Sequence, residues 1–374
     1  MKNNLVLALI TLWFVFTQLS AQVTHTGSTD SIKGGEQVKN LSIGGYIDSY
    51  MGYNFSQPKD GNNPYFVSMG RHNEATINLA YLDLKYSADR VRARFVPGIG
   101  TYMNANYALE PGLMKNFVEA SIGYQISAKK NIWIDFGILG SPYTNESAIS
   151  KDHLMYTRSF APEYVPYYLA GAKISFPFSK KLNGYVYLLN GWQQIQDQNI
   201  GKSIGTQIEY KPNDKNLFNW NTYLGDERSS SSPNNRMRYF TDIYWIYNPD
   251  GVFSITSCGY IGIQEQLVSN STVRNRQWWQ LNFIGRLKLH KTASLSGRIE
   301  YFSDPNSVQI IPITSGTGFN SYSSGLCFNL KLSENLLFRL EGRHFRSDKS
   351  LYLDLNNRPS NQSFWCISNL TVWF

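Results

Sequence analysis

The sequence has 374 residues, a formal net charge of +8 and an aromatic content of 15%. Beyond residue 21 no apolar run approaches the roughly 20 residues that a membrane-spanning helix needs, which excludes a helical membrane protein. Lys and Arg are dispersed and form no basic helix or zinc spacing, so the sequence predicts no nucleic-acid partner.

The N-terminal segment, residues 1–21, has the pattern of a secretory signal peptide. A charged start is followed by an apolar core and by a small-residue cleavage site that ends at Ala21. Residues 22–40 are polar and Gly-rich, and we expect them to form a periplasmic linker. The rest of the chain, residues 41–374, is predicted to form a single β-barrel domain.

From residue 41 onward the chain divides into runs in which every second residue is apolar, which is the period of a strand with two different faces. The predicted runs are 41–56, 75–87, 90–100, 117–127, 131–139, 167–178, 182–193, 203–211, 217–226, 236–247, 251–263, 276–289, 293–302, 318–332, 335–346 and 363–374. The connections between them alternate between tight turns and longer loops. An up-and-down barrel sorts its loops in this way, with short turns on one rim and long loops on the other.

The sequence therefore predicts an all-β fold, a transmembrane up-and-down antiparallel β-barrel of about 16 strands with short periplasmic turns and long extracellular loops. The last run ends on Phe374, which is similar to the C-terminal pattern of bacterial outer-membrane barrels. The run 75–87 changes parity near Ala80, where we expect a β-bulge. A soluble β-sandwich, with the apolar row buried and the charged row exposed, remains the alternative.

Charged side chains share one parity in many of the runs, opposite an apolar row. A Lys or Arg at the lipid midplane costs roughly 2–4 kcal/mol, so the charged row is predicted to face a water-filled lumen. The residues predicted to line this pore are Arg92, Arg94, Glu119, Asp135, Glu209, Arg286, Lys288, Arg298, Glu300, Arg339, Glu341 and Arg343. Basic members are in excess among the lumen-facing charges, which favours anions. The alternative is a salt-bridged ladder that only stiffens the wall.

The longest loop, residues 140–166, is predicted to fold into the barrel and narrow the channel. Its proline and aromatic content argues against disorder, and loops of this length are usually functional or disordered. Glu146 and Arg158 are the residues expected near the constriction. The alternative is an external lid that does not contact the solute.

Several short stretches resemble the OmpL-like β-barrel porin family. They are GYIDSY at residues 45–50, GSPY at 140–143 followed by Glu146, YTRS at 156–159 and LLNGW at 188–192. The resemblance spans most of the predicted barrel. It implies a channel of the outer membrane.

The function predicted from these observations is that of a porin in the outer membrane of a Gram-negative bacterium. It would form a water-filled channel for passive diffusion of small polar or anionic solutes, with outer-membrane lipid around it. Sixteen-strand porins are commonly trimers, so a homotrimer is an open alternative to a single barrel. A second functional class also stays open, namely a binding or adhesion barrel whose extracellular loops are the working part.

No enzymatic activity, metal site or cofactor is predicted. His344 falls on the outward row, and no G-x-S-x-G motif accompanies it as a lipase-type site would require. The three cysteines are far apart and lack the C-x-x-C spacing of a zinc site.

Overall fold

The computed structural model of the chain describes residues 40–269, 272–314 and 318–374. The predicted signal peptide, residues 1–21, and all but the last residue of the predicted linker, residues 22–40, lie outside these ranges. Among the residues described, none of the helices has both the length and the apolar character to span a membrane.

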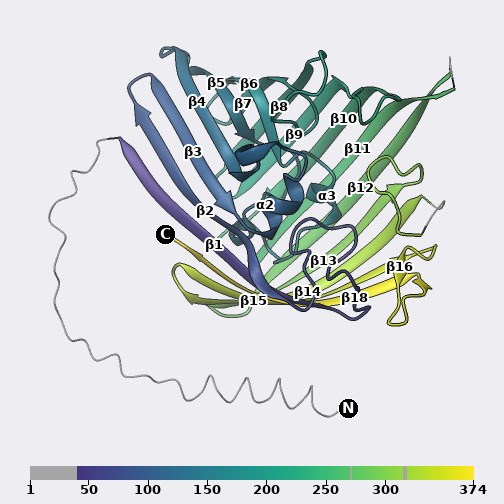
Figure 1. Cartoon of the computed structure of the whole chain (residues 1–374). Coiled ribbons are helices and arrows are strands. Elements are labelled where there is room, and N and C mark those ends of the chain that lie inside the picture. The colour runs from purple at the N-terminus through teal and green to yellow at the C-terminus, as the bar shows by residue number, and fades with distance from the viewer. Residues whose placement is uncertain (1–39, 270–271, 315–317) are drawn as a thin grey trace. The chain divides into compact units, whose positions relative to one another are not determined.

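Antiparallel strands form one closed barrel, in which consecutive strands are neighbours (Figure 1). The barrel strands are β1 (Leu41–Asn54), β2 (Ala75–Ala88), β3 (Val91–Ile99), β4 (Phe117–Ser127), β5 (Ile132–Gly140), β6 (Tyr168–Pro177), β7 (Leu182–Leu189), β8 (Ser203–Asn213), β9 (Asn216–Asp226), β10 (Asn235–Tyr247), β11 (Phe253–Ser269), β12 (Thr272–Lys288), β13 (Ala293–Asp304), β14 (Phe319–Ser333), β15 (Leu336–Ser347) and β18 (Gln362–Trp373). Pairing of β1 with β18 closes the barrel. The predicted all-β, up-and-down barrel of sixteen strands is confirmed.

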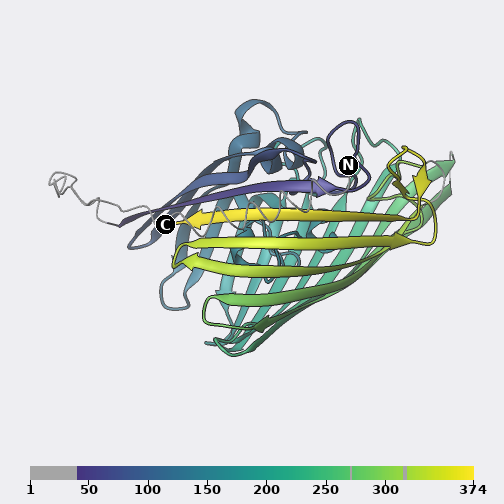
Figure 2. The ribbon, with the colours of Figure 1, turned by 90° about the horizontal axis from the view of Figure 1, so that it is seen from below.

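Short turns lie at one end of the barrel and long connections at the other (Figure 2). One predicted long loop, between residues 263 and 276, is wrong, because β11 and β12 continue to pair as far as Ser269 and Thr272. Polar residues such as Glu265 and Asn275 lie opposite each other in this extension. Backbone hydrogen bonds hold the two strands there, so the loss of the apolar alternation does not end them.

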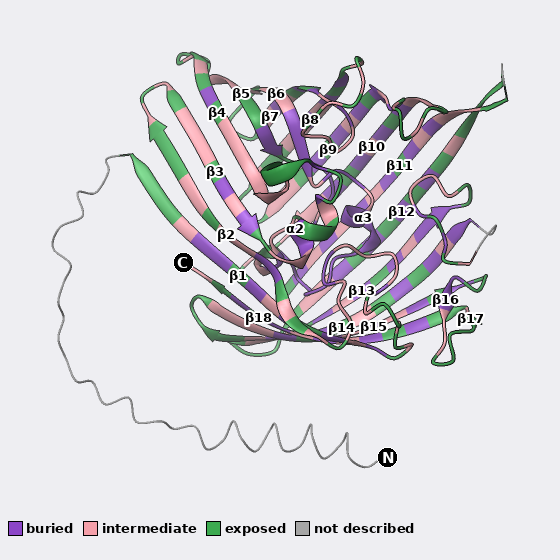
Figure 3. Ribbon diagram, in the orientation of Figure 1, coloured by how far each residue is buried: buried purple, intermediate pink, exposed green. Residues whose placement is uncertain are grey.

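The two faces of each strand differ in burial, as the alternating bands in Figure 3 show. In β15 the inward Arg339, Glu341 and Arg343 are at most 1% exposed, whereas Leu340 between them is 45% exposed on the outer face. The expected bulge in β2 lies at Asn78, where the register against β1 shifts. The Asn78 side chain points inward and donates to the Asp48 carboxylate at 3.0 Å.

The interior of the barrel is filled in part by its own loops. The helix α2 (Thr101–Asn106), the short helix α3 (Phe160–Glu163) and the 3-10 turn η2 (Ser150–Asp152) belong to connections between strands. Figure 1 shows α2 and α3 within the ring of strands. Side chains of the connections join inward-facing residues of the strands in three clusters of buried hydrophobic residues, one with α3 and another with α2.

Candidate functional site

The connection between β5 and β6, residues 141–167, crosses the interior of the barrel. The Thr144 amide donates to the Asp242 carboxylate of β10 at 2.6 Å, and the Phe160 amide donates to the Glu300 carboxylate of β13 at 2.6 Å. The Tyr46 hydroxyl of β1 lies 2.8 Å from the Ser150 hydroxyl. These strands lie on different sides of the ring, so the segment, which we call the inward loop, runs through its middle.

Five inward side chains of β13 and β15 hold this loop, and we call them the clamp. They are Arg298, Glu300, Arg339, Glu341 and Arg343. Arg298 forms an ion pair with Glu341 at 3.0 Å, and Arg343 forms one with Glu300 at 2.5 Å. All four of these side chains are inaccessible to solvent.

The clamp recognises the backbone of the inward loop. The Glu341 carboxylate accepts hydrogen bonds from the amides of Tyr156 and Thr157 at 3.0 and 2.8 Å. Arg298 donates to the Thr157 carbonyl at 2.6 Å, and Arg339 donates to the Ser150 carbonyl at 2.7 Å. The clamp residues were predicted to line the pore, and the structure places them on the inward row but covers them with protein. Their charges are therefore matched by ion pairs and backbone dipoles rather than by bulk water.

The two residues expected at the constriction, Glu146 and Arg158, are buried at 3% and 1% exposure. Glu146 accepts a hydrogen bond from the Ser159 amide at 2.9 Å, and burial raises the pKa of its carboxyl group. The Arg158 guanidinium lies between the rings of Tyr102 and Tyr167, 4.8 and 4.5 Å from their centroids. In this structure both side chains hold the inward loop in its fold, and neither faces open water.

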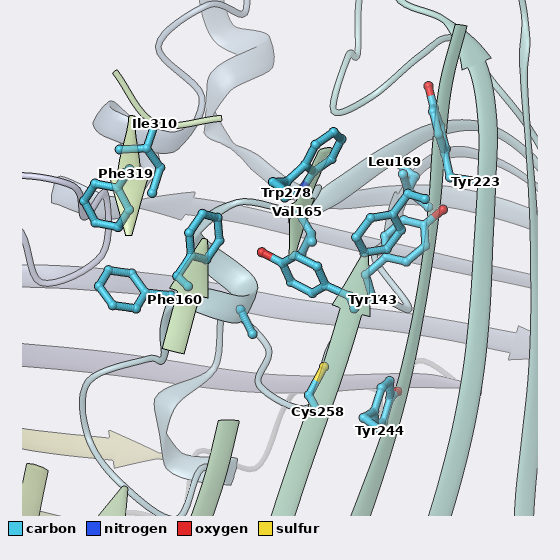
Figure 4. Close-up of a cluster of buried hydrophobic side chains, with 14 of the residues drawn as sticks. Tyr143, Phe160, Val165, Leu169, Tyr223, Tyr244, Cys258, Trp278, Ile310 and Phe319 are labelled. Atoms are coloured by element: carbon cyan, nitrogen blue, oxygen red, sulfur yellow. The ribbon is translucent and has the colours of Figure 1, made fainter. Parts of the chain in front are cut away.

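The largest hydrophobic cluster lies where the inward loop meets strands β5 to β7, β9 to β15 and β18 (Figure 4). Phe160 of the loop packs against Phe302, Phe319 and Phe345, with ring centroids 5.7 to 5.9 Å apart. In β13 and β15 the aromatic residues Phe302 and Phe345 occupy the same inward parity as the charged clamp, nearer the long-loop end of the strand. The inward row was predicted to be mainly polar and charged, so this cluster was not predicted. The signal is visible in β15, where Phe345 follows Arg343 on the same parity.

A second set of predicted pore residues lies on the opposite side of the barrel. Arg92 of β3 binds the Asp135 carboxylate of β5 through Nε and Nη2, at 2.7 and 2.6 Å. Arg94 binds Asp83 at 2.9 Å and Glu119 at 2.6 Å. These residues form the ladder, and all of them except Asp83 line a cavity of about 560 Å³ near the short turns. The two arginine side chains are 38% and 39% exposed, so the ladder is wet.

The remaining predicted pore residues also lie near the short-turn end. Glu209 of β8 forms an ion pair with Lys211 at 3.1 Å. Arg286 and Lys288 of β12 line a separate cavity of about 340 Å³, which we call the basic cavity. Arg286 Nη2 donates to the Asn248 side-chain oxygen at 2.6 Å.

Neither a metal site nor a disulfide is found in the part of the chain that the structure describes. It contains no group of three or more His, Cys, Asp or Glu side chains that could hold a metal ion. Cys258 and Cys327 are buried free thiols, and Cys366 is a half-buried free thiol.

Comparison with solved structures shows that this barrel has the porin fold. An anion-selective porin from Comamonas acidovorans has a TM-score of 0.57 at 8% identity, over 89% of this chain and 99% of that chain. The outer membrane channel DcaP of Acinetobacter baumannii gives 0.59 at 9% identity, over 89% and 97%. OmpT, an outer membrane protein of Vibrio cholerae, gives 0.56 at 8% identity, over the same shares.

A search among curated proteins gives no significant match. The sequence matches the family described as "Putative beta-barrel porin-2, OmpL-like" over residues 40–371. That match covers nearly all of the barrel, including the stretches that resemble the family. The chain therefore belongs to this family of OmpL-like β-barrel porins.

Proposed function

We propose that this porin lets small polar solutes diffuse across the outer membrane of a Gram-negative bacterium, with a preference for anions. The observation that supports this most directly is the composition of the two wet cavities at the short-turn end. The ladder cavity is lined by four Lys or Arg side chains and two carboxylates. The basic cavity is lined by five Lys or Arg side chains and one carboxylate. An excess of fixed positive charge along a solute path favours anions.

The inward loop is the proposed constriction. A barrel of sixteen strands is wide enough for an aqueous channel. Here the packed side chains of the loop and of the largest hydrophobic cluster occupy much of that width. We therefore expect a small single-channel conductance for a barrel of this strand number.

The outer surface suits lipid. Apolar side chains such as Ile122, Leu281 and Ile299 are 41 to 63% exposed there. A cleaved signal peptide at residues 1–21 would direct the chain to the envelope. A homotrimer is part of this proposal, and OmpT of Vibrio cholerae, which shares the fold, is described in a trimer form.

A second candidate function is a binding barrel whose long loops contact an external partner. The observation that favours it is the filled interior, since three hydrophobic clusters bring the loops and the inner wall together. A barrel that is closed by such packing would bind without conducting.

Recording in planar bilayers separates the two functions. The purified protein is expected to give discrete conductance steps, with a reversal potential in a salt gradient that indicates anion preference. Absence of steps from protein that is verified as folded would favour the binding barrel. Steps with cation preference would retain the channel and contradict the proposed selectivity.

A further inference from the structure

We propose that the basic cavity is a binding site for a small oxyanion that carries two or more negative charges, of the phosphate type. The inference deepens the proposed function, and it rests on that function only in placing the site on the path of a solute. The cavity lies at the short-turn end of strands β12 to β14. It is bounded by the turn residues 248–251 and 290–292 and by Lys151 and His153 of the inward loop.

The cations of this cavity come from neighbouring strands at one level of the wall. Lys288 of β12 lies opposite Ser294 of β13, and Ser294 lies opposite Asn329 of β14. Lys331 is the next inward residue of β14 after Asn329, and Arg286 is the inward residue that precedes Lys288. The fold therefore brings Arg286, Lys288 and Lys331 to the wall of a single cavity.

Among the described residues, these three cations have no carboxylate partner. Arg286 donates to two neutral oxygens, of Asn248 at 2.6 Å and of Ser254 at 2.9 Å. Lys288 donates to the Asp250 carbonyl at 3.5 Å. In the described ranges 40–269, 272–314 and 318–374, no ion pair joins Arg286, Lys288 or Lys331 to a carboxylate. Unpaired positive charge at close range is what a multivalent anion would neutralise.

A buried histidine gives independent support. His153 lines the cavity, is 8% exposed, and has no hydrogen-bond partner on either ring nitrogen among the described residues. The backbone of Ser147 interacts with the ring without a hydrogen bond of regular geometry, so the ring keeps a donor that it can offer to a ligand. Burial, followed by the charges of Arg158 and Arg339, lowers the pKa of His153, and these positive charges favour an anion beside the ring.

In the ladder cavity, by contrast, the basic side chains are paired with carboxylates. It lies at the same end, and there Lys85 and Lys173 each form an ion pair with a carboxylate, at 3.1 and 3.5 Å. An oxyanion can accept several hydrogen bonds at once from ammonium, guanidinium and imidazole donors. A halide offers one charge and no such geometry. The difference between the cavities points to an oxyanion at the basic cavity.

The test is equilibrium dialysis of the detergent-purified full-length protein against radiolabelled inorganic phosphate, with sulfate and chloride as competitors. The wild type is expected to bind phosphate saturably, and sulfate is expected to compete better than chloride. The double variant Lys288→Gln/Lys331→Gln is expected to weaken binding by about tenfold or more, equivalent to ~1.4 kcal/mol. The matched control Lys85→Gln/Lys173→Gln removes the same charge from the ladder cavity and is expected to change binding by less than about twofold.

Two results would overturn the inference: no saturable binding by the folded wild type, or equal weakening in both double variants. A difference in migration between unheated and boiled samples in detergent gels verifies folding, and His153→Ala provides a second test variant with no change in lysine charge. The result of the phosphate-binding test can be distinguished from the result of the bilayer test of the proposed function. Phosphate binding without anion preference in bilayers would contradict only the proposed selectivity. Anion preference without phosphate binding would contradict only the oxyanion site.

Discussion

The clamp and the ladder are two sets of arginine–carboxylate pairs on the same inward face, in opposite environments. In the clamp, Arg298 and Glu341 are fully buried beneath the inward loop. In the ladder, Arg92 is 38% exposed beside the wet cavity, although its partner Asp135 is 6% exposed. The sequence pattern is the same in both, a charged residue at every second position. The difference lies in what covers it, which is a loop from elsewhere in the chain.

Because the two sets differ in burial, removing one partner of an ion pair should lower the free energy of unfolding by different amounts in the clamp and in the ladder. Removing one partner of a buried pair leaves an uncompensated charge and costs about 3–5 kcal/mol. An exposed pair contributes about 0–1 kcal/mol because water and salt screen it. The clamp is therefore expected to determine where the loop sits, and the ladder to determine which ions pass.

The largest effect is expected when the inward loop itself is removed. Replacing residues 148–164 with a short Gly-Ser linker takes away most of the packing inside the barrel, so the single-channel conductance should rise severalfold. The β5–β6 pair remains joined, which keeps the barrel closed. Planar-bilayer recording measures the change, and an unchanged conductance would show that the loop does not limit the channel.

A smaller but still large effect is expected from the clamp. Glu341→Ala removes the acceptor of the Tyr156 and Thr157 amides and leaves Arg298 without that ion pair. The free energy of unfolding should fall by about 3–5 kcal/mol, measured by urea titration in detergent or vesicles. Glu119→Ala in the ladder is the matched control, with an expected loss of about 0–1 kcal/mol. Equal losses would mean that the clamp is not buried as described.

The third effect depends on pH. Burial, followed by the positive charges of Arg158 and Arg339, lowers the pKa of His153 well below its usual range. Below pH ~6.5 the unfolded chain takes up a proton that the folded protein does not, so stability falls as the pH falls. Between pH 7 and pH 5 the expected loss is about 2 kcal/mol. His153→Gln should remove this part of the pH dependence, and an identical profile in that variant would exclude His153 as its source.

A substitution in the ladder is expected to have the smallest effect on stability but to change the ion selectivity of the channel. Arg92→Gln should change the free energy of unfolding by less than about 1 kcal/mol. It should also shift the reversal potential toward cations, because it removes a fixed positive charge from the wet cavity. If selectivity stays constant while stability falls strongly, the ladder has only a structural role.

The architecture of the barrel could be predicted because it follows from local patterns. Strand period, turn chemistry and the alternation of loop lengths act within a few residues, and they fixed the strand number and the inward parity of Arg339 and Arg343. The parity change in β2 even indicated the bulge, which lies at Asn78, two residues from the expected place.

The contents of the barrel could not be predicted in the same way. Parity shows that Arg298 and Glu341 point inward, but it carries no information on whether water or a distant segment meets them there. The contact of Thr157 with Glu341 joins residues 184 positions apart. The aromatic cluster was missed because an inward Phe345 and an outward girdle aromatic look alike until the inner and outer rows are compared residue by residue.

The most direct test of the account is the accessibility of the inward loop to a bulky, membrane-impermeant maleimide. In a background with Cys258, Cys327 and Cys366 replaced by Ala, Ser150→Cys places a thiol at a position that is 0% exposed inside the barrel. Ser147→Cys places one at an exposed position of the same loop. The account predicts rapid labelling at 147 and labelling at 150 only after denaturation. Equal rates at both positions in the folded protein would contradict a loop held inside the barrel by the clamp.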